Sequence, residues 1–404
     1  MLKSIKITNF YSIGTEQNIS LNISSKDALD DSAREVKNGC FINTVMAIVG
    51  ANSSGKTNIL KSLSFLAWFI TKSYSSLKAE KSIPIEPHQL YTKKPISFEI
   101  EFYEKEILYR YFLKLDKKHV LYERLDKKND RWNKTPLFEL IRDSNEAKLK
   151  EYSIKRHLNE DDWSRIKERN NIALLSALID LNYLPEINFF KNIQSNVSAG
   201  GHQKFDNFHE SIMISQKLYN DKQLQKDILN FSKEIDLGIS DFTFHQVSLR
   251  NREDTDDDKK THILECKHTS QIGSFTLPIF EESNGTQRGF SILSDILPIL
   301  KEGGLMVLDE IEDGIHPSVI KKIISLFENK KTNPKNAQII FSTHQHFLLN
   351  DRTKTQILIT SKDNKSLESE VYRLDDIEGV RNDENYFHKY ITGIYGGTPN
   401  VKWI

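Results

Sequence analysis

The chain has 404 residues, of which 38% are hydrophobic and 28% are charged. This length predicts two or three structural units, or one large domain that carries an insertion, with enough apolar residues for a sizeable core. The 56 Lys and Arg residues balance the 56 Asp and Glu residues. That balance excludes a net positive charge that would attract the whole protein to nucleic acid or to a membrane surface. It does not exclude a local basic patch.

Two cysteines, Cys40 and Cys266, stand far apart and show no CxxC or Cys/His spacing. This pattern is typical of reduced, buried thiols rather than of a metal site. Residues 1–14 lack the apolar stretch of a signal peptide, and the apolar run 65–70 is too short to span a bilayer. We therefore expect a cytoplasmic protein with no membrane partner.

The N-terminal part predicts strands followed by a helix. Residues 2–8 and 17–23 alternate apolar and polar side chains, which indicates two strands. Residues 24–40 are polar and predict a loop, whereas residues 41–50 form a buried strand that runs into a Gly/Ser turn. A helix should follow over 57–74, because apolar residues recur at helical spacing at Ile59, Leu60, Leu63, Leu66, Ala67 and Ile70.

The middle of the chain changes character twice. Residues 96–126 alternate well and predict an antiparallel meander. From residue 135 to residue 237 the chain is charged, and we expect a mainly helical insertion broken by a loop at 195–205. Its helical patterns lie at 146–158, 172–181 and 221–235.

The last third of the chain predicts a parallel sheet. Residues 242–280 return to strand character around an acidic turn at 253–260, which we interpret as a solvated hairpin tip. Helical and buried strand segments then alternate, and such units place helices on the faces of a parallel sheet. The expected fold class is α/β, divided into an N-terminal lobe at 1–130, the insertion at 131–237 and a C-terminal lobe at 238–404.

The first chemical motif is a phosphate-binding loop. Residues 50–57 read Gly-Ala-Asn-Ser-Ser-Gly-Lys-Thr and match G-x-x-x-x-G-K-[ST] in full. The glycines let backbone N–H groups surround a phosphate, and the following helix presents its positive end to the same point. Lys56 would reach the β- and γ-phosphates, and the Thr57 hydroxyl would bind Mg²⁺. The alternative to phosphate binding is a Gly/Ser turn that only caps the following helix.

The second motif is an acidic pair, Asp309 and Glu310, that follows the apolar residues 305–308. The end of a buried strand is where open α/β sheets bind ligands. Asp309 is suited to hold Mg²⁺ and Glu310 to polarise the attacking water. Such a strand ending is common, so by itself it is weak evidence for a nucleotide site. Together with the phosphate loop it becomes strong evidence.

Two further motifs accompany these. Ser283-Asn-Gly285 lies about 25 residues before Asp309 and resembles the ABC signature, in which a helix start points at the γ-phosphate of another subunit. An ordinary helix cap is the alternative. His344 ends the buried strand 337–344 and matches the switch histidine of ABC-type ATPases in place and type. A metal site built from His344 and His346 is disfavoured, because no cysteine or carboxylate cluster accompanies them.

The order of these motifs resembles the SMC, RecF and OLD-like branch of the ABC-class P-loop ATPases. It is most similar to the bacterial AAA-type, OLD-like ATPases of phage defence and abortive infection. Residues 5–12 are similar to the start of these proteins, 309–317 to their acidic run ending in His-Pro, and 395–399 to a stretch near their C-terminus. The resemblance covers about residues 1–120 and 235–404.

The resemblance implies an ABC-type ATPase head with an antiparallel N-terminal meander, a parallel core and a helical insertion. It implies ATP and Mg²⁺ as ligands, with the metal on Thr57 and Asp309 and with Glu310, His344 and Lys56 as catalytic residues. Two heads would sandwich each nucleotide, so Ser283 and Gly285 would act on the other copy. The implied nucleotide-binding residues are Asn52, Ser53, Ser54, Gly55, Lys56, Thr57, Asn58, Ser283 and Gly285.

The sequence also departs from the family pattern. Tyr11 stands where relatives often carry Arg or Lys, and Ile311 replaces the usual proline. The signature reads Ser-Asn-Gly-Thr-Gln, and Gln89 is the candidate for a glutamine loop. Residues 312–316 match the family's D-loop, which would lie at the dimer seam.

The leading hypothesis for function is a dimerising ATPase that acts as sensor or regulator in antiphage defence. A separate effector such as a nuclease would be required, because only about 60 residues follow His344 and they hold no acidic nuclease constellation. The alternative is a DNA-repair or chromosome-maintenance ATPase of RecF/SMC type, in which the basic stretches 155–156 and 165–169 would contact DNA. Nucleic acid thus stays open as a partner. A transporter ATPase subunit fits less well, because a glutamine-loop motif is missing.

Overall fold

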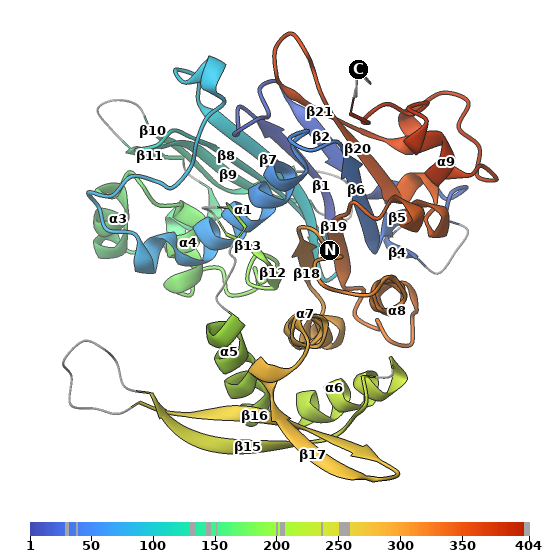
Figure 1. The fold of residues 1–404 in the computed structure, drawn as a ribbon. Helices are drawn as coiled ribbons and strands as arrows, with labels where there is room; N and C mark the ends of the chain where they lie inside the picture. Colours follow the sequence, from blue (N-terminus) through green and yellow to red (C-terminus); the bar gives the residue numbers. More distant parts are fainter. Residues whose placement is uncertain are drawn as a thin grey trace.

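The structure is a computed structural model, and it describes residues 1–28, 32–37, 39–128, 134–142, 147–150, 152–198, 201–202, 207–235, 237–249 and 259–399. The acidic turn expected at 253–260 lies largely outside these residues. Two large sheets form the upper part of the molecule in Figure 1, and a smaller sheet with two helices lies below them.

The first large sheet is antiparallel, with the strand order β11-β10-β9-β8-β7-β1-β2. Alternation of side chains builds it: along β7, Phe98, Ile100 and Phe102 are buried, whereas Glu99 and Glu101 face outward. Its strands are β1 (Leu2–Thr8), β2 (Gln17–Ser20), β7 (Ile96–Glu104), β8 (Ile107–Leu115), β9 (Val120–Lys128), β10 (Lys134–Arg142) and β11 (Ala147–Leu149).

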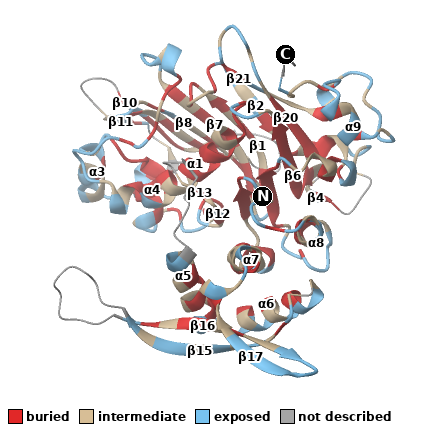
Figure 2. Cartoon of the chain, in the orientation of Figure 1, coloured by how far each residue is buried: buried red, intermediate tan, exposed pale blue. Residues whose placement is uncertain are grey.

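The second large sheet has the order β12-β18-β19-β6-β20-β21 and is parallel except for β21. All residues of β6 and β18 are buried, as the colouring of β6 in Figure 2 shows. Such strands are typical of a sheet covered on both faces. Its strands are β6 (Val45–Gly50), β12 (Ile193–Ser195), β18 (Leu305–Leu308), β19 (Gln338–Ser342), β20 (Ile357–Lys362) and β21 (Ser369–Arg373).

The parallel sheet separates two apolar cores. On one face, Met46 and Ile48 pack with helices α1 (Lys56–Ser76) and α4 (Leu174–Asp180) and with the antiparallel sheet. On the other face, Val45 and Ala47 pack with helices α7 (Asn284–Glu302) and α8 (Pro317–Glu328). Because successive side chains of a strand point to opposite faces of the sheet, β6 contributes residues to both cores.

The lower unit in Figure 1 is the antiparallel sheet β15-β16-β17, with α5 and α6 beside it. These elements join the same core as α7 through residues such as Leu218, Ile228 and Leu264. Its elements are α5 (Asn207–Asn220), α6 (Lys222–Glu234), β15 (Ile239–Leu249), β16 (Lys259–Ser270) and β17 (Gly273–Pro278). The remaining helices and strands are β3 (Asn22–Ile23), β4 (Ala33–Lys37), β5 (Cys40–Asn43), α2 (Ser153–His157), α3 (Glu160–Lys167), β13 (Val197–Ser198), β14 (Gly201–His202) and α9 (Tyr386–Ile391).

The fold confirms the α/β class, the antiparallel meander and the parallel core. Three local expectations were wrong. The polar stretch 24–40 contains β4, which pairs with β5 in a small sheet. The strand expected at 41–50 is two strands, β5 and β6, which belong to different sheets. The helical pattern at 146–158 is β11 followed by the short helix α2.

The segment expected to be mainly helical begins with strands. β10 pairs with β9 over Lys134 to Ile141 and so continues the meander. Farther along, β12 pairs with β18 at the edge of the parallel sheet. β10 pairs with the strand directly before it, but a register shift between Pro136 and Phe138 interrupts its alternation. β12 has only three residues, and its partner β18 lies more than 100 positions later in the chain. The division of the chain at residues 130 and 237 stays a prediction.

Within the described ranges, the helices are all too short or too polar to cross a lipid bilayer.

Candidate functional site

The phosphate loop lies between β6 and α1, at the carboxyl end of the parallel sheet. Gly55 caps α1 with a φ of 110°, and a Cβ at that position would lie 2.2 Å from the hydroxyl of Ser369. Only glycine fits this conformation and this close approach. The main chain can therefore turn its N–H groups toward a bound anion, at the positive end of a helix of 21 residues.

Lys56 points back into its own loop. Its Nζ donates hydrogen bonds to the carbonyl oxygens of Gly50 (2.8 Å) and Ala51 (3.1 Å), and the residue is only 7% exposed. Burial lowers the pKa of Lys56, while the carboxylates of Asp309, Glu310 and Glu312 partly restore it. The ammonium group is thus bound by two main-chain carbonyl oxygens of its own loop, within the field of three carboxylates.

Thr57 and Asp309 meet directly. The Thr57 hydroxyl donates a hydrogen bond of 2.7 Å to Asp309 Oδ2, although 252 residues separate them. Asp309 is 4% exposed, and its Oδ1 accepts a hydrogen bond of 2.5 Å from the Ser342 hydroxyl. A hydroxyl beside a carboxylate supplies the oxygen donors that Mg²⁺ prefers, with phosphate and water completing the shell. These residues fit the metal that the motifs imply.

Glu310 lies at the rim of the site. Its φ of 51° is unusual for a non-glycine residue, and its side chain is 54% exposed. The Glu310 N–H donates to the Ser342 hydroxyl at 2.8 Å, and the carboxylate oxygen Oε1 lies 4.0 Å from His344 Nε2. The acidic pair thus separates into a buried residue and an exposed one, as a metal ligand and a general base require.

His344 is fixed through its main chain. Its N–H donates to the carboxylate of Glu312, in the segment that matches the D-loop. The structure therefore brings together Lys56, Thr57, Asp309, Glu310 and His344 from three separate motifs.

The other residues of the loop have supporting contacts. The Ser54 hydroxyl is buried and lies 2.5 Å from that of Thr360. Asn58 Nδ2 donates to the Ser12 hydroxyl at 2.6 Å, which ties α1 to the segment at 9–12. Asn52 and Ser53 are exposed at the tip of the loop.

Ser283 and Gly285 lie at the start of α7. The Ser283 hydroxyl accepts a hydrogen bond of 3.2 Å from the Thr286 N–H, so it caps its own helix. A Cβ at Gly285 would lie 2.7 Å from the carbonyl oxygen of Gly314, so the signature-like turn packs against the D-loop segment. Ser283 is exposed. Its expected action on a second copy stays a prediction.

Two residues of the site escaped the sequence analysis. Asn196 donates from Nδ2 to the Asp309 carbonyl at 2.9 Å and accepts from the Asp309 N–H at 2.8 Å, so it holds the main chain of that residue on both sides. Ser342 joins Asp309 to the Glu310 N–H. Ser342 could have been found, because it stands in the strand before His344. No local sequence pattern indicates that Asn196 belongs to the site.

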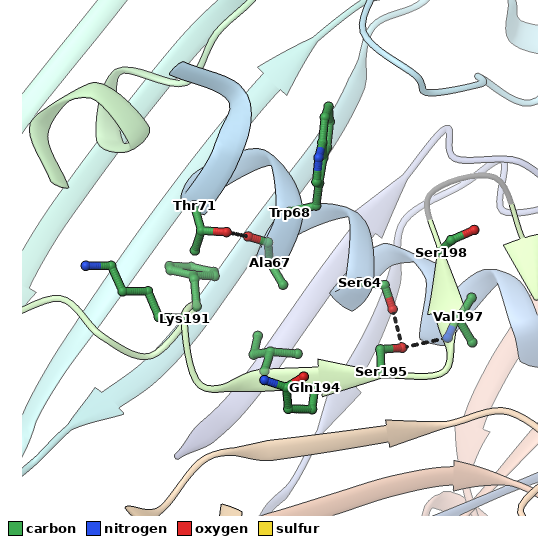
Figure 3. Close-up of a pocket in the computed structure, with 11 residues that line it drawn as sticks. Ser64, Ala67, Trp68, Thr71, Lys191, Gln194, Ser195, Val197 and Ser198 are labelled. Carbon is green, nitrogen blue, oxygen red and sulfur yellow. Dashed lines mark hydrogen bonds between the residues drawn. The ribbon is translucent and has the colours of Figure 1, made fainter. Parts of the chain in front are cut away.

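The middle of α1 contacts the residue before Asn196. Figure 3 shows Ser64 of α1 beside Ser195, with their hydroxyls 2.7 Å apart, and the Val197 N–H donating to Ser195 Oγ at 3.0 Å. These residues line a pocket of about 580 Å³ beside α1. The helix that carries Lys56 and Thr57 therefore also fixes the segment that holds Asp309.

The departures from the family pattern have physical explanations. The Ile311 N–H donates to the Ser342 carbonyl at 3.1 Å, a bond that proline could not make. Lys61 Nζ lies 3.7 Å from the centroid of the Tyr11 ring, so a cation is present beside Tyr11. Gln89 is exposed in a short 3₁₀ turn.

The described residues contain no cluster of three or more His, Cys, Asp or Glu side chains that could hold a metal ion by themselves.

No curated protein matches. The chain is similar to solved SMC head domains. One is an SMC head bound to the C-winged helix domain of ScpA, with 15% identity, a TM-score of 0.46, and coverage of 92% of this chain and 96% of that one. A second is the SMC head domain from Thermotoga maritima, with 14% identity, a TM-score of 0.41, and coverage of 92% and 98%.

A third is an SMC head domain with an extended coiled coil bound to the C-terminal domain of ScpA derived from Pyrococcus furiosus. It has 14% identity, a TM-score of 0.39, and coverage of 93% of this chain and 97% of that one. The model of a protein family described as "AAA domain, putative AbiEii toxin, Type IV TA system" matches residues 45–350. This match spans the phosphate loop, the acidic pair and His344, and the chain belongs to this AAA domain family.

Proposed function

We propose that the protein binds and hydrolyses ATP, and that two copies close around the nucleotide as a switch. The hydrogen bond between Thr57 and Asp309 carries this proposal, because it unites the phosphate loop with the acidic strand end at the point where a metal–phosphate group would sit. The buried Lys56 beside three carboxylates supports the same conclusion.

Each residue then has one task in the reaction. Lys56 and the N–H groups of the loop hold the β- and γ-phosphates. Thr57 and Asp309 would hold Mg²⁺, which neutralises phosphate charge when it is bound. Glu310 is exposed enough to meet a water molecule and accepts its proton. His344, whose Nε2 lies 4.0 Å from Glu310 Oε1, would contact the γ-phosphate.

The Glu310→Gln variant tests this mechanism. It should bind ATP, lose turnover, and accumulate as a dimer that light scattering detects after gel filtration with ATP. Lys56→Ala, which removes a phosphate contact, should stay monomeric under the same conditions. If Glu310→Gln turns over ATP at the rate of the parent protein, Glu310 is not the general base.

We further propose that this switch regulates abortive infection together with a separate effector. The family's description, which names a putative AbiEii toxin of a type IV toxin–antitoxin system, supports this role. Cells that carry the chain with its neighbouring gene should reduce phage plaque numbers, and Lys56→Ala should abolish the reduction. Protection that survives Lys56→Ala would exclude the nucleotide switch from this role.

The DNA-repair alternative rests on the basic stretches 155–156 and 165–169. Lys155 and Arg156 are exposed, whereas Arg169 donates to the carbonyl oxygens of Tyr74 and Leu77. On the antiparallel sheet, basic side chains are paired with acidic ones. Lys3 pairs with Glu101 at 2.8 Å, and Arg110 pairs with Glu99 at 2.5 Å. Charges that neutralise one another leave little attraction for phosphates of a nucleic acid.

A further inference from the structure

The phosphate loop touches a segment near the end of the described chain. Helix α9 is followed by a turn that runs to Pro399, and we call residues 386–399 the C-terminal strap. The Ala51 N–H, at the second position of the phosphate loop, donates a hydrogen bond of 2.7 Å to the Gly397 carbonyl. The strap therefore fixes the main chain where it leaves β6.

Gly397 is itself held tightly. The Tyr390 hydroxyl donates to the same Gly397 carbonyl at 3.2 Å. The φ of Gly397 is 70°, and a Cβ there would lie 2.5 Å from Ile359 Cγ2 and 3.1 Å from the Thr360 carbonyl. Both contacts are with β20, the direct neighbour of β6 in the parallel sheet. The position of the Gly397 carbonyl therefore depends on a residue without a side chain.

The strap also reaches the other wall of the nucleotide site. The ring of Tyr390 packs against the imidazole of His346, with 4.7 Å between centroids. His346 stands two residues after the candidate switch histidine. A pocket of about 640 Å³ lies between these walls. Its lining is Gly50, Ala51, Asn52, His344, His346, Tyr390, Ile391, Thr392, Gly393, Thr398 and Pro399.

His346 has the properties of a group prepared for a polar ligand. Its Nε2 is buried and has no hydrogen-bond partner among the described residues. Burial, helped by His344 and Lys56, lowers the pKa of His346 to about 4, so the ring is neutral at pH 7. A buried polar atom without a partner is costly, and a role in ligand binding explains it.

We propose that the C-terminal strap is a positioning element of the nucleotide site. Gly397 sets the phosphate loop through Ala51, and Tyr390 sets His346 on the opposite wall of the pocket. ATP affinity therefore depends on residues more than 40 positions beyond His344. This inference rests on the proposed ATP binding, and its test separates the two.

The variant Gly397→Ala tests the strap, with Gly379→Ala as its matched control. Both glycines have positive φ values, 70° and 85°, but a Cβ at Gly379 would meet nothing within 4 Å. Both variants thus carry the same backbone strain, and only one displaces the strap. The measurements are the Kd of a fluorescent ATP analogue with Mg²⁺ and the unfolding temperature without nucleotide.

We expect Gly397→Ala to raise the Kd by about tenfold relative to Gly379→Ala, because small displacements of a binding loop are costly. Equal Kd values for the two folded variants would overturn the proposal. If the parent protein does not bind the analogue at all, ATP binding itself fails, which is a different result.

A second pair of variants decides the matter if Gly397→Ala does not fold. Tyr390→Phe removes the hydroxyl that binds the Gly397 carbonyl. Tyr152→Phe is the control, because it removes a hydroxyl that donates at the same distance, 3.2 Å, to Glu139 Oε2 outside the strap and the site. A Kd raised about threefold in Tyr390→Phe alone, at an unchanged unfolding temperature, supports the strap. Equal Kd values for Tyr390→Phe and Tyr152→Phe would contradict it.

Discussion

The Thr57 hydroxyl donates a hydrogen bond of 2.7 Å to Asp309 Oδ2, and this contact closes the candidate nucleotide site. Thr57 follows the phosphate loop on α1, whereas Asp309 follows β18. The two side chains come together because β6 and β18 flank β19 in one parallel sheet and end at the same edge. The geometry of the sheet thus brings two separate sequence motifs together and places their side-chain oxygens within hydrogen-bond distance.

Thr57→Val should abolish ATP turnover while leaving the fold intact. The substitution keeps the shape but removes the hydroxyl, so Mg²⁺ loses a ligand and activity should fall about 100-fold or more. Thr71→Val is the control, because it removes from the same helix a hydroxyl that bonds only to the Ala67 carbonyl in α1. Phosphate release measured against Mg²⁺ concentration distinguishes the two. Similar rates in both variants would remove Thr57 from the metal site.

Asn196→Ala should reduce turnover more than it reduces stability. Asn196 makes two hydrogen bonds to the main chain of Asp309, and their loss lets the carboxylate move. We expect a loss of about 1–2 kcal/mol in the free energy of unfolding and a fall of at least tenfold in kcat. Gln194→Ala is the control: it changes an exposed residue of the preceding strand, β12, and should leave both the free energy of unfolding and kcat unchanged. A normal kcat in Asn196→Ala would contradict the positioning role.

Ser283→Arg tests whether the signature-like turn acts on a second copy. Ser283 is exposed and caps its own helix, so arginine there should obstruct closure without disturbing the phosphate loop of the same chain. Nucleotide affinity of the monomer should be unchanged, while dimer formation with ATP and hydrolysis are both lost. Thr276→Arg on the exposed strand β17 provides the control. Normal hydrolysis by Ser283→Arg would show that this turn has no role in trans.

The pH dependence of stability should report on His346. Its pKa is about 4 in the folded chain against 6.5 in a model peptide, because burial and the nearby His344 and Lys56 disfavour the charged ring. A lowered pKa means that the unfolded state binds more protons between pH 6.5 and pH 4, so stability falls as the pH falls through this window. From pH 7 to pH 5 the free energy of unfolding should drop by about 1–2 kcal/mol on account of this group.

Urea unfolding of the parent protein and of His346→Gln at pH 7 and pH 5 measures this contribution. The loss in the free energy of unfolding from pH 7 to pH 5 should be about 1–2 kcal/mol smaller in His346→Gln than in the parent protein. If the two proteins lose stability equally, His346 is not held in its neutral form by the fold.

Local patterns were sufficient to predict the ends of β1, the helix α1 and the strands β18 and β19 within a few residues. β1 alternates its apolar residues, α1 repeats them at helical spacing, and β18 and β19 are continuous buried runs. The same patterns placed Lys56, Thr57, Asp309 and His344 at the carboxyl ends of buried strands, because a phosphate loop and an acidic strand end have recognisable spacing.

Local patterns failed where a segment is irregular or short, or where its partner is distant in the sequence. A register shift interrupts β10 where it pairs with the preceding strand β9. β12 has only three residues, which pair with β18 more than 100 positions later. Asn196, Ser342 and Gly397 join the site through contacts that span 113, 33 and more than 300 positions.

The sequence by itself determined which chemical groups the candidate site contains: an eight-residue phosphate loop, an acidic pair and a histidine. Each of them lies beside a strand or helix whose own residues show a recognisable pattern. Only the tertiary structure decided which other residues hold that chemistry in place. Side-chain periodicity is a short-range property of a single element, whereas a hydrogen bond between two elements depends on how the whole sheet is ordered.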